Sequence, residues 1–211
     1  MRLVIESATA ACSVALLDGD RLIDERHEIV GRGHAERLVP MIAELLAGRI
    51  PSSILVDCGP GSFTGVRVGL AAAHGLAIGW RVPLAGCSSL ALIAAAADAA
   101  ELAVALHGGH GQLFVQSYRH GPLAPQDALQ SLAPADAAAA IGAHAVYGSG
   151  AEALVSARGY GTAHDALPRA ADAARLPPDL AALPPRPIYG RAPDARPVPG
   201  DAAGGVEGPM T

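Results

Sequence analysis

Two kinds of hydrophobic pattern alternate along the first hundred residues. Short apolar runs at 3–5, 13–17 and 54–56 have the length and composition of buried strands. Longer stretches at 34–47 and 63–80 repeat apolar residues at intervals of three and four, as one face of a helix does. The pattern therefore predicts a layered α/β arrangement.

Turn residues give the order of these elements. Asp18-Gly19-Asp20 predicts a tight hairpin into a third strand over 21–29. The chain returns to the sheet at 83–86, and Ser88 or Ser89 caps a further helix that we expect to reach Ala100. An antiparallel meander extended by parallel strands is similar to half of a ribonuclease-H-like fold.

A second half of the same kind begins near Leu102. We expect two mixed sheets flanked by helices, as two ribonuclease-H-like subdomains over 1–101 and 102–192. A tail over 193–211 is rich in proline and glycine, and we expect it to be disordered. The elements expected in the second half are strands at 102–106, 113–118 and 145–147 and helices at 134–141, 151–157 and 168–176.

The amino-acid composition and charge indicate what the core consists of and which kinds of partner the chain can bind. The chain is 51% hydrophobic but only 3% aromatic, so its core is built mainly from Ala, Leu, Val and Ile. The net charge of -5 and the absence of a basic block argue against direct nucleic-acid binding. The sequence shows neither a signal peptide nor an apolar stretch long enough for a membrane span, so we expect a cytoplasmic protein.

The most distinctive stretch is the turn Asp57-Cys58-Gly59-Pro60-Gly61-Ser62-Phe63-Thr64-Gly65, between a strand and a helix. This arrangement is either an anion-binding loop or a tight structural corner. All 15 basic residues are arginine, so the lysine of a Walker loop is missing. Thr64 stands where the dinucleotide fingerprint requires glycine.

Three groups of side chains are candidates for chemistry. Glu6 and Asp57 end neighbouring predicted strands, as an acid/base or magnesium pair does, although a structural role is the simpler interpretation. His107 and His110 form a metal pair or a solvent-facing turn. Ser62, His74 and Asp57 lack the pattern of a nucleophile elbow.

Several segments together resemble the TsaB (YeaZ) family, and the glycine turn is the most specific of them. The resemblance spans nearly the whole chain and implies an actin/Hsp70-like fold of two ribonuclease-H-like halves. The segments are Ile5-Glu6-Ser7-Ala8-Thr9, Cys12-Ser13-Val14-Ala15-Leu16, His34-Ala35-Glu36-Arg37-Leu38-Val39-Pro40, Gly59 to Arg67, Tyr147-Gly148-Ser149-Gly150-Ala151 and Pro187 to Ala195.

The resemblance also implies a function. Family members act in the bacterial pathway that places threonylcarbamoyl on the tRNA adenosine next to the anticodon, as non-catalytic partners of the metal-bearing TsaD subunit. The two metal ligands of TsaD fall on Ser89 and Ile93, which cannot replace imidazole. Glu6 stands where the family has aspartate, and His107-Gly108-Gly109 stands where it has Asp-Ala-Arg. Both departures weaken the case for a nucleotide site.

The resemblance implies no catalytic and no metal-binding residue in this chain. It does imply two other groups of functional residues. A TsaD-type subunit is expected to dock on the first two helices, through His34, Arg37, Leu38, Met41, Leu45, Arg67, Leu70 and His74. A vestigial phosphate loop is expected at Glu6, Ser7, Thr9, Asp57, Gly59, Gly61 and Ser62.

The expected partners include a TsaE-type ATPase, tRNA only through the complex, and a second copy of the chain when the TsaD-type subunit is absent. No cofactor is expected, with ATP or ADP bound by the complex or only weakly. The alternatives are an actin-like-fold enzyme, such as a kinase or peptidase, and a nucleotide-sensing module.

Overall fold

The computed structural model describes residues 1–190; the tail expected over 193–211 lies outside this part of the chain. The first half forms a five-stranded sheet in the order β3-β2-β1-β4-β5. β1 pairs antiparallel with β2 and parallel with β4, and β4 pairs parallel with β5. The strands are β1 (Arg2–Glu6), β2 (Ala11–Asp18), β3 (Arg21–Ile29), β4 (Ser53–Asp57) and β5 (Leu84–Cys87).

The second half forms a six-stranded sheet in the order β11-β10-β6-β7-β8, and β9 also pairs with β7. β6 pairs antiparallel with β7 and parallel with β10. The strands are β6 (Glu101–His107), β7 (Leu113–Arg119), β8 (Ala124–Pro125), β9 (Gln130–Leu132), β10 (Ala145–Tyr147) and β11 (Thr162–His164). Mixed sheets in both halves confirm the predicted fold class.

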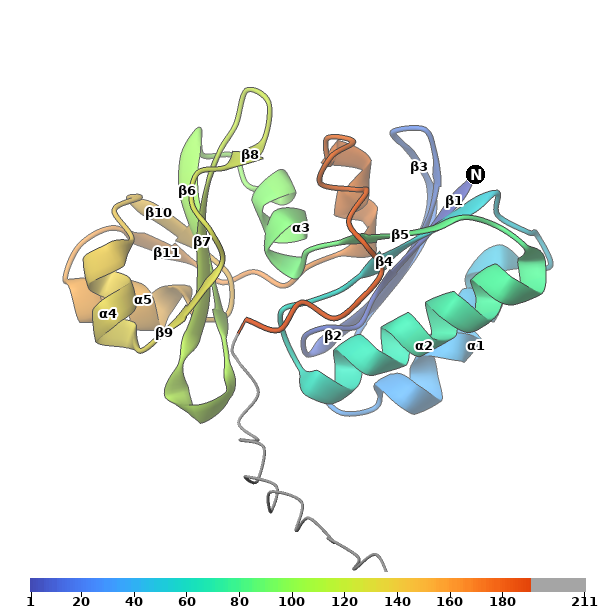
Figure 1. The fold of residues 1–211 in the computed structure, drawn as a ribbon, viewed down its shortest axis with the longest axis horizontal. Helices are drawn as coiled ribbons and strands as arrows, with labels where there is room; N and C mark the ends of the chain where they lie inside the picture. The colour runs from blue at the N-terminus through green and yellow to red at the C-terminus, as the bar shows by residue number, and fades with distance from the viewer. Residues whose placement is uncertain (191–211) are drawn as a thin grey trace, which may run out of the picture.

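Helices and sheets alternate in layers across the molecule (Figure 1). α1 (His34–Leu46) and α2 (Phe63–Trp80) cover the outer face of the first sheet, and α4 (Pro134–Ala140) and α5 (Ala151–Arg158) cover the outer face of the second. α3 (Ser89–Ala96) and the 3-10 helix η2 (Ala170–Arg175) lie between the sheets. Each sheet therefore has an apolar core on both faces.

Two expectations about elements were wrong in detail, and the short strands β8, β9 and β11 were not predicted. The helix expected to reach Ala100 ends at Ala96, before Asp98 and the start of β6. The helix expected over 168–176 is the 3-10 helix η2. β11 was not predicted, because its three residues Thr162–His164 carry no run of apolar side chains and are defined by pairing with β10.

The segment after β11 returns to the first half. Ala170 N donates a hydrogen bond to Ser13 Oγ at 3.0 Å. Leu183 and Gly86 exchange two backbone hydrogen bonds at 2.9 and 2.7 Å along the edge of β5. Residues 183–190, which we call the strap, therefore pack against the first half of the molecule, beside the edge strand β5. Within residues 1–190, every helix is too short or too polar to cross a membrane.

Candidate functional site

A buried acidic pair lies where β1 and β4 end. Ile5 and Val56 are register partners, so Glu6 and Asp57 follow on adjacent parallel strands, and both are almost wholly buried. Burial and the neighbouring Asp57 carboxyl raise the pKa of Glu6 well above its usual value. Burial raises the pKa of Asp57 to about 7. Two buried carboxyls this close favour a state in which one is protonated.

Short hydrogen bonds hold each carboxyl in place. Ser89 Oγ lies 2.7 Å from Asp57 Oδ2 and donates to it, and Gly59 N donates to Asp57 Oδ1 at 2.7 Å. Ala8 N donates to Glu6 Oε1 at 2.7 Å, whereas Glu6 Oε2 is buried without a partner among the described residues. Asp57 therefore ties together β4, the glycine turn and the start of α3.

The two turns that contain the predicted phosphate-loop residues pack directly against each other. Ser62 N donates to Ala8 O at 2.6 Å, and Ser7 Oγ donates to Gly65 O at 2.9 Å. A Cβ on Gly61 would lie 2.0 Å from Ala8 O, and one on Gly65 2.1 Å from Ser7 O. The structure thus brings the predicted loop residues together, in a closed contact that favours the structural corner over the anion loop.

The backbone amides of Gly59, Ser62 and Gly65 in this turn donate hydrogen bonds within the chain itself. Ser62 Oγ accepts from Gly65 N at 3.3 Å as the cap of α2, and Ser62 O accepts from Val66 N. Thr9, the last predicted loop residue, has its Oγ1 3.3 Å from Ala11 N. Two buried carboxyls lie close to this helix start, and their negative charge disfavours a phosphate there.

Five of the eight predicted docking residues lie on the buried sides of their helices. Leu38, Met41, Leu45 and Leu70 are buried in the core between the first sheet and its outer helices, so they do not form an exposed patch. His34 is also buried, with Nε2 2.9 Å from Ala11 O. The helical spacing of the leucines was interpreted correctly as one apolar side of each helix. That side packs against the first sheet, so it is not available to a partner.

The remaining three predicted docking residues reach the surface. Arg37 is half-buried and bonded to Glu28 and Glu44. Arg67 and His74 are exposed on α2. The exposed apolar side chains of this layer were missed, although each lies outside the buried stripe of its helix: Val39 is 61% exposed, Phe63 68% and Ile78 77%.

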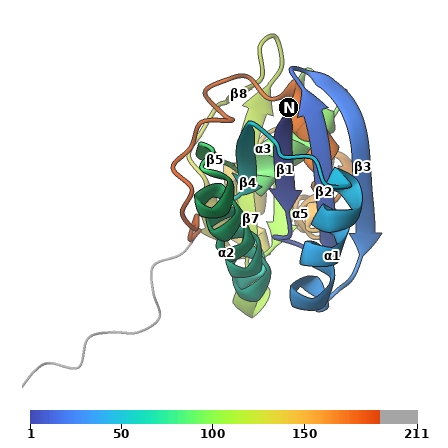
Figure 2. The same cartoon turned by 90° about the vertical axis from the view of Figure 1, so that its right-hand side faces the viewer.

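The helices α1 and α2 lie next to each other on the outer side of the first sheet (Figure 2), and both carry exposed small and apolar residues. We define the α1–α2 face as the exposed Val39 and Ala43 of α1 with the exposed Ala71, Gly75 and Ile78 of α2. Glycine and alanine allow another helix to approach closely, so this surface is suited to helix packing.

The other candidate groups do not assemble. Ser62 and His74 are twelve positions apart, about 18 Å along α2 at 1.5 Å per residue, and Asp57 is buried against Ser89, so there is no triad. His107 and His110 are exposed. Over residues 1–190 no three His, Cys, Asp or Glu side chains gather as a metal site would require.

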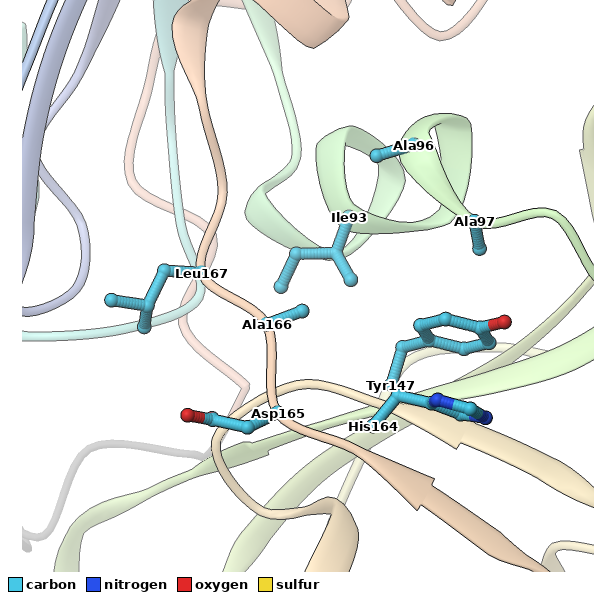
Figure 3. A pocket seen from close by; sticks show the side chains of 8 residues that line it. All are labelled: Ile93, Ala96, Ala97, Tyr147, His164, Asp165, Ala166 and Leu167. Carbon is cyan, nitrogen blue, oxygen red and sulfur yellow. The ribbon is translucent and has the colours of Figure 1, made fainter.

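One cavity of about 230 Å³ lies between the halves, where α3 approaches the ends of β10 and β11 (Figure 3). The rings of Tyr147 and His164 stack with centroids 4.5 Å apart, and Ile93 faces them from α3. The cavity lining is mostly aliphatic. It has few of the convergent polar groups that orient a small ligand.

Comparison with known proteins places this architecture. The family described as TsaD, tRNA N6-adenosine threonylcarbamoyltransferase, matches residues 26–145. The protein named tRNA threonylcarbamoyladenosine biosynthesis protein TsaB is 35% identical over 126 residues in Escherichia coli, covering 56% of this chain and 54% of that protein. The protein of that name in Haemophilus influenzae is 44% identical over 101 residues, covering 45% and 42%.

The matched region therefore spans about half the length of these curated relatives or less. A crystal structure from Pseudomonas aeruginosa, of an uncharacterized protein with similarity to peptidase YEAZ, superposes with a TM-score of 0.76 at 28% identity. The superposition covers 90% of this chain and 99% of the Pseudomonas aeruginosa chain. The fold is thus the actin/Hsp70-like fold of YeaZ, and the chain belongs to the TsaD family, in its TsaB (YeaZ) group.

Proposed function

We propose that the chain is a non-catalytic accessory subunit in tRNA threonylcarbamoyladenosine synthesis, which binds a TsaD-type catalytic subunit through the α1–α2 face. The names of the curated TsaB relatives support the pathway. The observation that carries the docking role is the exposed apolar and small-residue surface of the α1–α2 face.

A comparison of the two outer helix layers supports this use of the α1–α2 face. α4 and α5 cover the second sheet just as α1 and α2 cover the first, yet neither α4 nor α5 carries a large exposed apolar side chain. Covering a sheet therefore does not require apolar residues on the outer side. Val39 and Ile78 are better explained by a second surface that covers them.

The closed glycine corner supports the non-catalytic part of the proposal. Ser89 and Ile93, which stand at the positions of the TsaD metal ligands, are buried; Ser89 bonds to Asp57, and Ile93 lines the aliphatic cavity. We expect neither metal nor nucleotide to bind to this chain on its own. A TsaE-type ATPase and tRNA would join through the cytoplasmic complex, and two copies would pair through the same face when the TsaD-type subunit is absent.

The test is co-expression with the TsaD-type subunit of the same organism, followed by size-exclusion chromatography with light scattering. A one-to-one complex is expected for the wild type, and Val39→Glu or Ile78→Glu should abolish it without lowering the melting temperature. Leu22→Glu, at a 45% exposed position in β3, is the matched control and should leave the complex intact. Absence of a wild-type complex would contradict the docking role.

A further inference from the structure

The strap runs along the outward side of the first half and meets α2 at several points. His74 Nε2 lies 3.1 Å from Pro185 O, and Ile188 N donates to Cys58 O at 2.8 Å. Ile188 packs at the edge of the core under α2. The strap therefore has a defined position beside the part of α2 between Arg67 and His74, and it runs antiparallel to the helix.

At its end the strap completes an exposed cluster. The guanidinium of Arg67 lies over the Phe63 ring, 3.1 Å from its centroid, and its Nη2 donates to Tyr189 Oη at 3.1 Å. Phe63 and Tyr189 are 68% and 59% exposed. Arg67 thus holds two large aromatic rings in solvent-exposed positions. Since none of these three side chains is buried, the stability of the core does not explain their arrangement. We call these residues the Phe63–Arg67–Tyr189 cluster.

The charge around this cluster is unlike that of the chain as a whole. Residues 63–81 and 183–190 contain three arginines, Arg67, Arg81 and Arg186, and neither Asp nor Glu, although the net charge of the chain is -5. None of the ion pairs found within residues 1–190 involves these arginines. The surface thus offers a guanidinium that this part of the chain does not neutralise.

We propose that the Phe63–Arg67–Tyr189 cluster is the anchor of the docking surface and that it binds a carboxylate of the TsaD-type subunit, flanked by apolar side chains. This inference rests on the proposed function. A planar guanidinium pairs with a carboxylate through two parallel hydrogen bonds. Exposed Arg, Tyr and Phe side chains that become covered on binding are typical hot-spot residues. The strap acts as a positioning element, because it places Tyr189 against Arg67.

A phosphate of RNA would satisfy the same guanidinium, so the choice of a protein carboxylate needs a reason. The cluster continues along α2 into Ala71, Gly75 and Ile78, a surface of small and aliphatic side chains. Nucleic-acid surfaces instead concentrate cations along the path of the backbone. Three arginines beside an aliphatic helix face favour a protein partner.

The experiment measures the affinity of the purified full chain for the purified TsaD-type subunit by titration calorimetry at two salt concentrations. Arg67→Glu should weaken binding by about a hundredfold, and Tyr189→Ala by about tenfold, as the loss of hot-spot side chains commonly does. Arg67→Lys keeps the charge but loses the planar fork, and should also weaken binding. Arg67→Gln should reduce the salt dependence. Arg119→Glu, on β7 in the second half, is the matched charge reversal and should change affinity less than twofold.

The outcomes separate the two proposals. If the wild type does not bind, the proposed function fails and the anchor fails with it. If Ile78→Glu abolishes binding while folded Arg67→Glu and Tyr189→Ala bind normally, only the anchor is overturned. If Arg67→Glu leaves subunit affinity unchanged but lowers tRNA binding by the assembled complex in a mobility-shift assay, the guanidinium takes a phosphate, which also overturns this inference. Melting temperatures of all variants exclude unfolding as the cause.

Discussion

The two faces of α2 both contain glycine, but for different reasons. On the inner face, Gly65 and Gly69 meet the β1–β2 turn so closely that a Cβ would lie 2.1 Å from Ser7 O and 2.5 Å from Ser7 Oγ. On the outer face, a Cβ on Gly75 or Gly79 would meet nothing within 4 Å. The inner glycines are therefore required by the fold. The outer ones lower helix stability, and no contact within the described chain requires them.

The largest expected effect comes from the inner face. Gly65→Ala places a methyl against the backbone carbonyl of Ser7, which cannot move without shifting the β1–β2 turn and breaking the Ser7–Gly65 hydrogen bond. We expect a loss of about 3 kcal/mol or more in unfolding free energy, as overpacking of a rigid core can cause. Urea denaturation measures it. A stable Gly65→Ala protein would show that the corner is looser than the contact indicates.

The next effect tests the buried side chain of the same helix. Leu70 lies in the core between α2 and the first sheet. Leu70→Ala should lower the unfolding free energy by about 2–4 kcal/mol, since it removes apolar contact and leaves a cavity. Ile78→Ala, about two turns further along α2 on the exposed side, should change it by less than 0.5 kcal/mol, as surface substitutions usually do. Equal effects would remove the distinction between the faces.

The sequence determined the inner face better than the outer one. Apolar spacing located α1, α2 and the strands of the first sheet, because burial against a sheet requires a continuous stripe. The same spacing suggested that Leu38 and Leu70 belong to a docking patch, which was wrong, because one stripe cannot serve both the core and a partner. Val39 and Ile78 could have been found as apolar residues outside that stripe. Tyr189 could not be assigned to the cluster with Arg67, since their contact joins segments 122 positions apart.

A third prediction concerns the acidic pair beneath the corner. Because the pKa of Asp57 is raised to about 7 and its unfolded value is 3.8, the native state binds the extra proton between these values. Stability from this group is therefore complete at low pH and is lost as the pH rises through about 7. Asp57→Asn removes the titration and keeps an acceptor for Ser89. We expect its stability relative to wild type to rise by roughly 2 kcal/mol from pH 5 to pH 8, since one pKa unit is about 1.4 kcal/mol.

Urea unfolding of both proteins at several pH values measures this difference. Subtracting one curve from the other cancels the titrating groups that do not interact with Asp57, such as His27, whose pKa is lowered by burial. Parallel curves for wild type and Asp57→Asn would show that the Glu6–Asp57 pair holds no shared proton near neutral pH. If Asp57→Asn instead became more stable relative to wild type as the pH falls, the predicted direction of the Asp57 pKa shift would be wrong.

The smallest effect on the fold gives the sharpest test of the outer face. Gly75→Ala adds a methyl in open space inside a helix, so it should raise the unfolding free energy by about 0.5–1 kcal/mol. If Gly75 allows a partner helix to approach closely, the same methyl should weaken the complex with the TsaD-type subunit several-fold. Gly142→Ala, also in open space but outside the helices, should leave affinity unchanged. A Gly75→Ala variant that is more stable and binds as well as wild type would show that Gly75 has no role in docking. A variant that is more stable but binds more weakly would show that this glycine lowers the stability of the helix in order to allow docking.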